Sequence, residues 1–262
     1  MYSITRPLSP GSEKIEGVLF DLGHTLLYFD GDWTQSIPQS DAQLVASLGS
    51  AGCHLDGETF IPRFRSLLQA YHQERENEFI EYTTAYILRQ VLAEYGYPAV
   101  TDEVIQKALA SMYRVTQVSW KPEPDAHPTL ETLRKYGYRL GLISNAGDDA
   151  DVQTLLDQAN LRAYFEIILT SAGQGIRKPN PEIFWTALKH LNIPPGNVAM
   201  VGDTLGADIL GAYNAGIYSI WITRHAESPA NRAHADTIQP DAKIERLEDL
   251  SPLLACLSGS PA

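Results

Sequence analysis

Five short apolar segments, each of the length of a β-strand, recur along this chain of 262 residues. They are Ile15–Phe20, Arg139–Ser144, Glu166–Thr170, Val198–Val201 and Tyr218–Ile222. Segments of helical length separate the last four and precede the second, namely Pro128–Tyr136, Val152–Ala159, Pro181–Leu191 and Ala207–Ala215. Strands that are apolar throughout and alternate with helices are typical of a parallel sheet covered on both faces. We therefore expect an α/β fold with a Rossmann-like, doubly wound parallel sheet.

The stretch between the first two apolar segments does not show this alternation. From Gly31 to Trp120 no strand pattern is convincing, and four helical patterns occur at about Ser40–Leu48, Glu58–Glu78, Tyr82–Tyr95 and Asp102–Val115. In the last of these, apolar residues recur at helical spacing, and Thr101 or Asp102 can cap its start. The three prolines of Lys121–Pro128 indicate a hinge back into the sheet. We expect a core domain of residues 1–30 and 121–262, interrupted by an inserted α-helical domain of residues 31–120.

Acidic residues outnumber basic residues by 32 to 20, which gives a formal net charge of −12. This charge argues against nucleic acid or an anionic membrane as the main partner, because both attract basic surfaces. It does not exclude a phosphate ligand, because a bound metal and a few cations can reverse the field within one cleft. The four tryptophans can belong to a core or to an interface, so a monomer and a homodimer both stay open.

The sequence shows no signal for export or membrane insertion. Met1 to Ser12 contains no apolar run of the kind found in signal peptides, so we expect a loose N-terminal tail. No apolar segment approaches the ~20 residues that a helix needs to span a bilayer. Cys53 and Cys256 lack metal-type spacing and are too few for a disulfide framework, so both are expected to be buried or half-buried. A cytoplasmic location is the resulting expectation.

Polar residues follow the carboxyl ends of four predicted strands. They are Asp21, the pair Ser144 and Asn145, Lys178, and the pair Asp203 and Asp208. Each has an ordinary explanation by itself, such as a turn aspartate, a helix cap or a solvated lysine. Ligands of open parallel sheets bind in a crevice at the carboxyl ends of the strands, so the four sites can converge in space.

The order of these motifs resembles that of the haloacid dehalogenase-like hydrolases. Asp21 matches the nucleophile of their first motif, Ser144 the second, Lys178 the third, and Asp203 with Asp208 the fourth. The resemblance extends from Ile15 to about Leu254 and includes a helical cap domain inserted after the first motif, the type called C1. It implies the strand order 5-4-1-2-3, which places Asp21 beside Asp203.

The resemblance also implies a metal site. Its direct ligands would be the carboxylate of Asp21, the backbone carbonyl of Gly23 and the carboxylate of Asp203, while Asp208 would act directly or through water. Carboxylates brought so close together repel one another, and a hard divalent cation removes that conflict. Oxygen ligands with room for water and phosphate suit Mg²⁺.

The chemistry that the resemblance implies is hydrolysis of a phosphate ester. Asp21 would attack phosphorus in line and form an aspartyl-phosphate, which water would then cleave. Lys178 would neutralise charge between Asp21 and the phosphate. Ser144 and the backbone around Asn145 would hold phosphate oxygens.

One position departs from the family pattern. Phosphatases of this group usually carry a second aspartate two residues after the nucleophile, which protonates the leaving group and activates water, but this chain has Gly23. General acid–base assistance typically contributes ~10²–10⁴-fold. Three explanations stay open: His24 supplies the proton, the substrate has a good leaving group or its own acid, or the protein only binds phosphorylated ligands. The presence of Asp21 favours a working enzyme, because binding alone has little need for it.

The inserted domain has 11 acidic residues against 6 basic ones, which fits a small phosphorylated metabolite better than a polyanion. Its candidates for substrate contact, each of which can equally pack between helices or face solvent, are Lys107, Arg63, Arg65, Arg75, Arg89, Arg114, Tyr71, His72, Tyr82 and Tyr86. The leading hypothesis is a Mg²⁺-dependent phosphatase, and the alternative is a non-catalytic or weakly catalytic phosphate-binding protein. A 2-haloacid dehalogenase ranks lower, because that branch usually has a serine–asparagine pair where this chain has Gly202 and Asp203.

Overall fold

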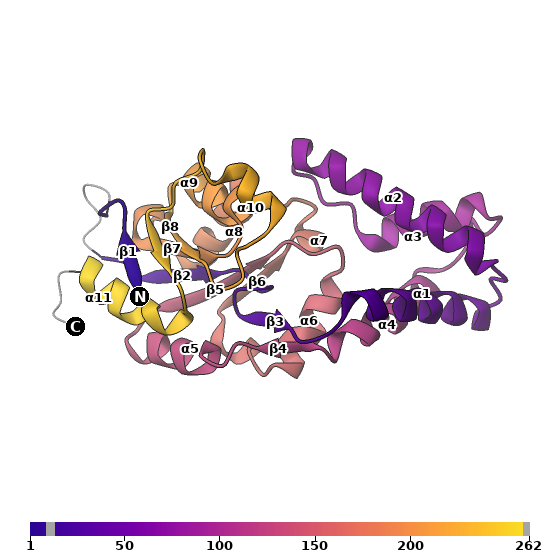
Figure 1. Ribbon diagram of the computed structural model, residues 1–262, viewed down its shortest axis with the longest axis horizontal. Helices are drawn as coiled ribbons and strands as arrows, with labels where there is room; N and C mark the ends of the chain where they lie inside the picture. The colour runs from indigo at the N-terminus through magenta and orange to yellow at the C-terminus, as the bar shows by residue number, and fades with distance from the viewer. Residues whose placement is uncertain (9–13, 259–262) are drawn as a thin grey trace.

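The computed structural model describes residues 1–8 and 14–258, apart from the side chains of residues 72–78. Figure 1 shows an elongated molecule, with the sheet and its helices at one end and a group of long helices at the other. Within the described residues, a seven-stranded sheet has the order β1-β9-β8-β7-β2-β5-β6. Its strands are β1 (Tyr2–Ile4), β2 (Gly17–Phe20), β5 (Arg139–Ser144), β6 (Ile167–Thr170), β7 (Val198–Gly202), β8 (Tyr218–Ile222) and β9 (Ala242–Ile244).

The strands that the apolar segments predicted lie next to one another and run parallel. In chain order they occupy the positions 5-4-1-2-3, which confirms the predicted order and the doubly wound fold. The first of them, β2, lies between β5 and β7, with Val18 level with Leu140 and Ala199. Neighbouring residues of β2 pack on opposite faces, Leu19 in one hydrophobic cluster and Phe20 in another, as the pleat of a strand requires.

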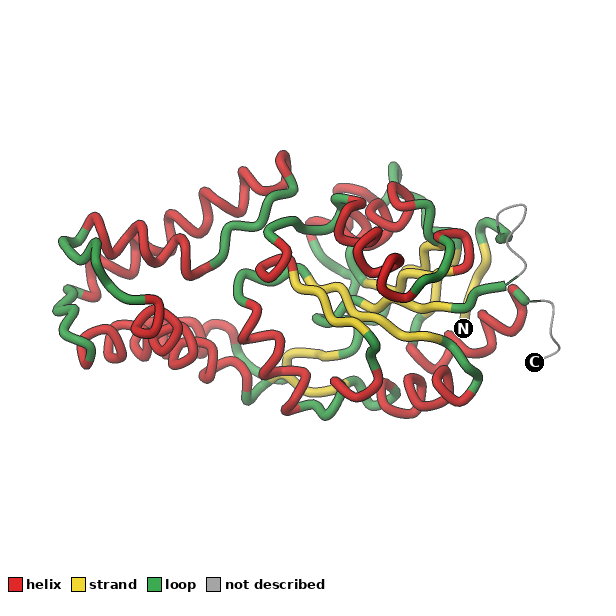
Figure 2. The backbone as a smooth tube through the Cα atoms, turned by 180° about the vertical axis from the view of Figure 1, so that it is seen from behind, coloured by secondary structure: helices red, strands yellow, loops and turns green. Residues whose placement is uncertain are grey.

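Helices cover both faces of the sheet (Figure 2). One hydrophobic cluster includes residues of α5 (Ala126–Lys135), α6 (Asp149–Gln158) and α11 (Leu250–Leu257), and the other includes residues of α8 (Pro181–Leu191) and α9 (Leu210–Ala215). Helix α8 has its predicted bounds, and the Oδ1 atom of Asn180 caps it by accepting the Glu182 N–H at 3.0 Å. The predicted helix Ala207–Ala215 instead begins as a π-helical turn, η3 (Leu205–Ile209), which carries Asp208.

The N-terminal segment is not the loose tail that the sequence predicted. Strand β1 pairs antiparallel with β9 and forms the edge of the sheet. The Tyr218 hydroxyl donates to the Arg6 carbonyl at 2.7 Å, and the Arg6 guanidinium pairs with Asp241 at 2.5 Å. A three-residue edge strand has too short a pattern to be recognised in a sequence. Residues 9–12 of the predicted tail lie outside the described part of the chain.

The inserted segment forms helices that share a hydrophobic cluster of their own. They are α1 (Trp33–Ser50), α2 (Gly57–Glu78), α3 (Thr84–Glu94) and α4 (Asp102–Gln117). Helix α4 begins as predicted, and Thr101 caps it by accepting the Val104 N–H at 3.4 Å. Helix α1 begins earlier than predicted, because Asp32 accepts the Thr34 N–H at 2.8 Å and the helix continues through Pro38.

The two chain segments that connect the inserted helices with the core pair with each other. They form a two-stranded antiparallel sheet of β3 (Leu27–Phe29) and β4 (Trp120–Pro122). The sequence predicted a hinge here but neither strand, because three residues are too few to show a period. Arg224, which follows β8, holds the second segment by pairing with Glu123 and with Asp125, the latter at 2.6 Å.

The structure bears on two further expectations. Cys53 is buried as predicted, whereas Cys256 is exposed, so the expectation was wrong for Cys256. That residue lies on the outer side of α11, a helix that buries Leu253 and Leu254 instead. Among the described residues, no helix combines the length and the apolar character that crossing a bilayer requires.

Candidate active site

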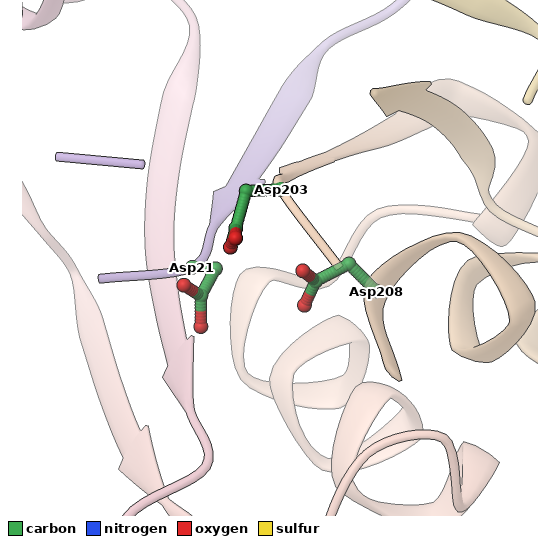
Figure 3. A group of neighbouring side chains, drawn as sticks. All are labelled: Asp21, Asp203 and Asp208. Carbon is green, nitrogen blue, oxygen red and sulfur yellow. The ribbon is translucent and has the colours of Figure 1, made fainter. Parts of the chain in front are cut away.

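Three aspartates meet at the carboxyl ends of two central strands, as Figure 3 shows. Asp21 directly follows β2, and Asp203 directly follows the neighbouring strand β7. Asp208 comes from the π-helical turn η3. One carboxylate oxygen of each residue lies within 4.8 Å of the other two, and all three side chains are buried or nearly so. The sheet order therefore brings together carboxylates that lie far apart in the sequence.

Lys178 provides the positive charge at the centre of this cluster. Its Nζ atom donates to Asp21 Oδ1 at 2.6 Å, to Asp208 Oδ1 at 2.6 Å and to the Ile143 carbonyl at 2.7 Å. These three bonds use all the donors of an ammonium group, as its full burial requires. The lysine is thus a part of the site rather than a solvated surface charge.

Burial and the charges of neighbouring side chains shift the pKa values of the cluster. Burial, together with the charges of Asp21 and Asp208, raises the pKa of Asp203 to about 8. Burial also raises the pKa of Asp208 to about 6, although Lys178 opposes the change. The pKa of Lys178 is raised, because the attraction of Asp208 and Asp21 exceeds the effect of burial. The site therefore holds more negative charge than its lysine can balance, and its donors are oxygens that fit a hard divalent cation.

Ser144 and Asn145 lie at the end of β5, beside the cluster. The Asn145 side chain makes two hydrogen bonds with the backbone of Lys178: its Nδ2 donates to the Lys178 carbonyl at 2.9 Å, and its Oδ1 accepts the Lys178 N–H at 2.9 Å. Asn145 therefore fixes the loop that carries the lysine. Its Nδ2 atom keeps a second N–H, and both Asn145 and the buried Ser144 line the cavity described next.

A cavity of about 410 Å³ opens above these residues. Its lining includes every site residue that the sequence predicted, namely Asp21, Gly23, His24, Ser144, Asn145, Lys178, Asp203 and Asp208. A larger cavity of about 780 Å³ lies near Arg224 and Arg246, but it contains no comparable cluster. The smaller cavity is the candidate active site, because there, within the described part of the chain, convergent carboxylates and a buried lysine meet a space for a ligand.

Comparison with known proteins shows the family of the chain. A model of haloacid dehalogenase-like hydrolases matches residues 15–216. The chain belongs to this family. It is 29% identical to the glyceraldehyde 3-phosphate phosphatase of Pyrococcus abyssi, over 94% of this chain and 96% of that one. Similar solved structures include a 2-haloacid dehalogenase from Pseudomonas syringae pv. Tomato DC3000 (28% identity, 92% and 99% of the two chains, TM-score 0.64) and a HAD phosphatase from Thermococcus onnurineus (25%, 92% and 98%, 0.61).

Gly23, where phosphatases of this hydrolase family usually have an aspartate, leaves room at the cavity wall. A Cβ atom built there would lie 3.7 Å from the nearest atom, Cη2 of Trp120. The next residue, His24, has a left-handed backbone with φ of 57°, and its ring centre lies 5.5 Å from that of Trp120 and 6.0 Å from that of His225. Burial and the neighbouring His225 lower the pKa of His24, against the opposing charge of Glu123.

Of the cap residues selected from the sequence, those whose side chains the structure describes do not line this cavity. The Tyr71 hydroxyl accepts the Tyr82 N–H at 2.6 Å, which is a structural role. Tyr82 and Tyr86 stack on each other with ring centres 5.1 Å apart. The side chains of His72 and Arg75 lie outside the described residues. A different cap tyrosine, Tyr113, lines the cavity, and the sequence analysis did not select it.

Sequence reasoning also missed two aspartates on the cavity wall. Asp148 caps α6 by accepting the Asp151 N–H at 2.9 Å, and Asp151 accepts a hydrogen bond from Gln117 of the cap at 2.8 Å. Burial is the main cause that raises the pKa of both, and that of Asp151 reaches about 6. The sequence contained a signal for these two residues, because the acidic run from Asp148 to Asp151 comes soon after Ser144 and Asn145 at the end of a predicted strand.

Proposed function

We propose that this hydrolase is a Mg²⁺-dependent phosphatase that acts on a small phosphorylated metabolite. The observation that carries the proposal is the buried cluster of Asp21, Asp203 and Asp208 at the floor of the cavity. Three carboxylates exceed the charge of Lys178, and such a cluster is stable only with a further cation or with bound protons. The similarity to glyceraldehyde 3-phosphate phosphatase supports a small substrate.

The metal ligands in this proposal are the Asp21 carboxylate, the Gly23 carbonyl and the Asp203 carboxylate. Bound Mg²⁺ would supply charge neutralisation for the transferring phosphoryl group. Both oxygens of Asp208 already accept hydrogen bonds, one from Lys178 Nζ at 2.6 Å and one from the Thr204 N–H at 2.9 Å. This favours contact of Asp208 with the ion through water.

Asp21 is the proposed nucleophile. Lys178 donates to its Oδ1 atom, which fixes the carboxylate at the floor of the cavity and lowers the repulsion that an incoming phosphate meets. The second oxygen would attack phosphorus in line, the bond from phosphorus to the leaving oxygen would break, and water would later cleave the aspartyl-phosphate. The Ser144 hydroxyl would donate a hydrogen bond to a phosphate oxygen.

The proton for the leaving group comes from His24 or from the substrate itself in this proposal. His24 lies on the cavity wall next to Gly23, the place of the missing aspartate. Its lowered pKa favours the neutral imidazole, which suits a base that activates water in the second step and disfavours His24 as the acid in the first step. A substrate with a good leaving group would need less help at this position.

A dehalogenase remains the competing activity because of the similarity to a 2-haloacid dehalogenase. Such an enzyme would use Asp21 to attack carbon and would need no metal. The combination of Asp203 and Asp208 beside Asp21 argues against it, because uncompensated carboxylates next to the nucleophile would hold part of the site protonated. The phosphatase is therefore the better-supported function.

A cytoplasmic location and a monomeric or homodimeric state belong to the same proposal. The thiols of Cys53 and Cys256 are free, which is usual in a reducing compartment. Light scattering after size-exclusion chromatography would decide between the monomer and the dimer.

The test is hydrolysis of p-nitrophenyl phosphate with Mg²⁺ and with EDTA, beside release of halide from 2-chloropropionate. Phosphate release that needs both Mg²⁺ and Asp21 is the expected result, with Asp21→Asn inactive. Asp236→Asn, the same chemical change on an exposed residue, is the matched control and should keep full activity. Halide release in EDTA without phosphate release would contradict the proposal and would favour the dehalogenase.

A further inference from the structure

A segment of the cap lies directly against the loop that carries Lys178. This segment, residues 79–83, connects α2 with α3. The Arg177 N–H donates to the Phe79 carbonyl at 3.0 Å, and the Glu81 N–H donates to the Gly175 carbonyl at 3.0 Å. Ile80 and Ile176 form a bridge between the two segments. The cap is thus hydrogen-bonded, in a strand-like manner, to the chain next to the lysine.

The side chain of Glu81 continues this contact into the core domain. Its Oε2 atom accepts the Ser171 hydroxyl at 2.8 Å and lies 3.7 Å from Arg177 Nη1. Its Oε1 atom lies 3.1 Å from the Tyr71 hydroxyl, whose proton is shared with the Ile80 carbonyl at 2.9 Å. The carboxylate is fully buried. Among the described residues, Arg177 Nη1 has no hydrogen-bond partner, so Glu81 is its nearest counter-charge. A buried carboxylate is stable only where such partners are in place, so this contact depends on the cap lying against the core domain.

Ser171 links Glu81 to the other loop of the site. Its Oγ atom accepts the Ala146 N–H at 2.9 Å and lies 3.1 Å from the Ala146 carbonyl. A hydroxyl has one proton to donate, so Ser171 gives it either to Glu81 or to the Ala146 carbonyl. A hydrogen bond to a carboxylate is the stronger choice when the cap is in place. Ala146 follows Asn145, whose side chain holds the Lys178 backbone.

We propose that Glu81 is a positioning residue that couples closure of the cap to the geometry of the phosphate site. When the cap closes, its carboxylate accepts a hydrogen bond from the Ser171 hydroxyl and faces Arg177, which fixes the Asn145 and Lys178 loops together. When the cap opens, Arg177 loses this counter-charge and Ser171 turns to the Ala146 carbonyl. The inference rests on the proposed function, because these loops are the ones that hold Asp21 and the phosphate in that proposal.

Kinetics of Glu81→Gln, Ser171→Ala and the double variant test the coupling. Each single variant should lower kcat/KM for p-nitrophenyl phosphate by roughly 10-fold or more, as loss of a supporting partner typically does. The kcat/KM of the double variant should lie within about 3-fold of that of the less active single variant, because both substitutions remove the same hydrogen bond. Glu94→Gln is the matched control: this cap carboxylate pairs with Arg63 at 2.7 Å but is well exposed, and its loss should leave kcat/KM unchanged. The proposal would be overturned if the fold-loss in kcat/KM of the double variant equalled the product of the two single losses. It would also be overturned if the variants lowered the melting temperature and left kcat and KM unchanged.

Hydrogen exchange of the Glu81 and Arg177 amides gives a readout that needs no turnover. Both amides bridge the cap and the core, so Glu81→Gln should exchange them at least about 10-fold faster than wild type, whereas Glu94→Gln should not. Equal protection in both variants would overturn the proposal even in an active phosphatase. A wild-type protein without phosphatase activity would defeat the proposed function, while the exchange measurement would still decide whether Glu81 holds the two domains together.

Discussion

Gly23 is the residue whose replacement would say most about the chemistry. A Cβ atom fits there, with its nearest contact at 3.7 Å, and the backbone is not in the left-handed region. We predict that Gly23→Asp folds and raises kcat/KM for an alkyl phosphate by at least ~10-fold, since general acid assistance is typically worth ~10²–10⁴-fold. The gain for p-nitrophenyl phosphate should be much smaller, because its leaving group hardly needs a proton. Equal gains for both substrates would show that the aspartate does not act as the acid.

The role of His24 can be tested by removing its side chain and comparing the loss of activity on the same two substrates. If His24 provides the proton, His24→Ala should slow an alkyl phosphate by ~10²-fold and p-nitrophenyl phosphate only slightly. His225→Ala is the control for packing, because His225 lies 6.0 Å from the His24 ring but outside the cavity lining. Equal losses for both substrates in His24→Ala would remove the histidine from the reaction and leave the substrate as the source of the proton.

The raised pKa of Asp151 should make the free energy of unfolding depend on pH. Burial raises its pKa from 3.8 to about 6, so the folded chain holds this proton more tightly than the unfolded chain. Its contribution to stability therefore falls as the pH rises from about 4 to about 6 and stays low above that, a difference of ~3 kcal/mol at most.

Asp151→Asn should remove this dependence. The amide oxygen can still accept from Gln117, and no charge is buried, so the variant should unfold at higher urea than wild type at about pH 7.5 and at similar urea near pH 4. Asp157→Asn is the control, because Arg162 lowers the pKa of that exposed carboxyl and its loss should bring no gain. A variant that is less stable at both pH values would refute the prediction.

At the scale of elements, the cap helices are stabilised separately from the sheet. Leu109 of α4 is buried in the cluster that α1 to α4 share, and the two other clusters belong to the core domain. We predict that Leu109→Ala costs ~2–5 kcal/mol, as buried Leu→Ala changes do. Ile37→Ala on α1 is the control: Ile37 is well exposed, so its loss should cost far less.

The location of that loss can be measured by hydrogen exchange. Amides of α3 and α4 should exchange faster in Leu109→Ala, while those of β2 and β7 should not change. Uniform loss of protection across the sheet would mean that cap and core unfold as one unit.

At the scale of the whole molecule, the metal should stabilise the fold and compete with protons. Mg²⁺ at the three aspartates needs them ionised, and burial with mutual repulsion keeps Asp203 and Asp208 protonated at low pH. We predict that Mg²⁺ raises the melting temperature more at about pH 8 than at about pH 5.5. Asp203→Asn should lose most of this response, while Asp236→Asn should keep it. A rise that is independent of pH and of Asp203 would place the ion elsewhere.

The local part of the site could be predicted from the sequence. The strands Arg139–Ser144 and Tyr218–Ile222 have their predicted bounds, because a buried strand is apolar along its whole length and this pattern is local. The resemblance to a family added the order of the strands, and with it the meeting of Asp21 and Asp203. Short strands such as β1, β3 and β4 were missed, since three residues carry no period.

The sequence by itself indicated the longer strands, the helical pattern of the inserted segment, and the polar residues that stand at the ends of those strands. Only the tertiary structure decided that Glu81 reaches Ser171, that Asn145 serves the Lys178 backbone, and that Asp151 is buried against the cap. The physical reason is that an apolar pattern records which side of an element is buried. It does not record which distant residue it is buried against, and hydrogen bonds between residues far apart in the chain depend on that second choice.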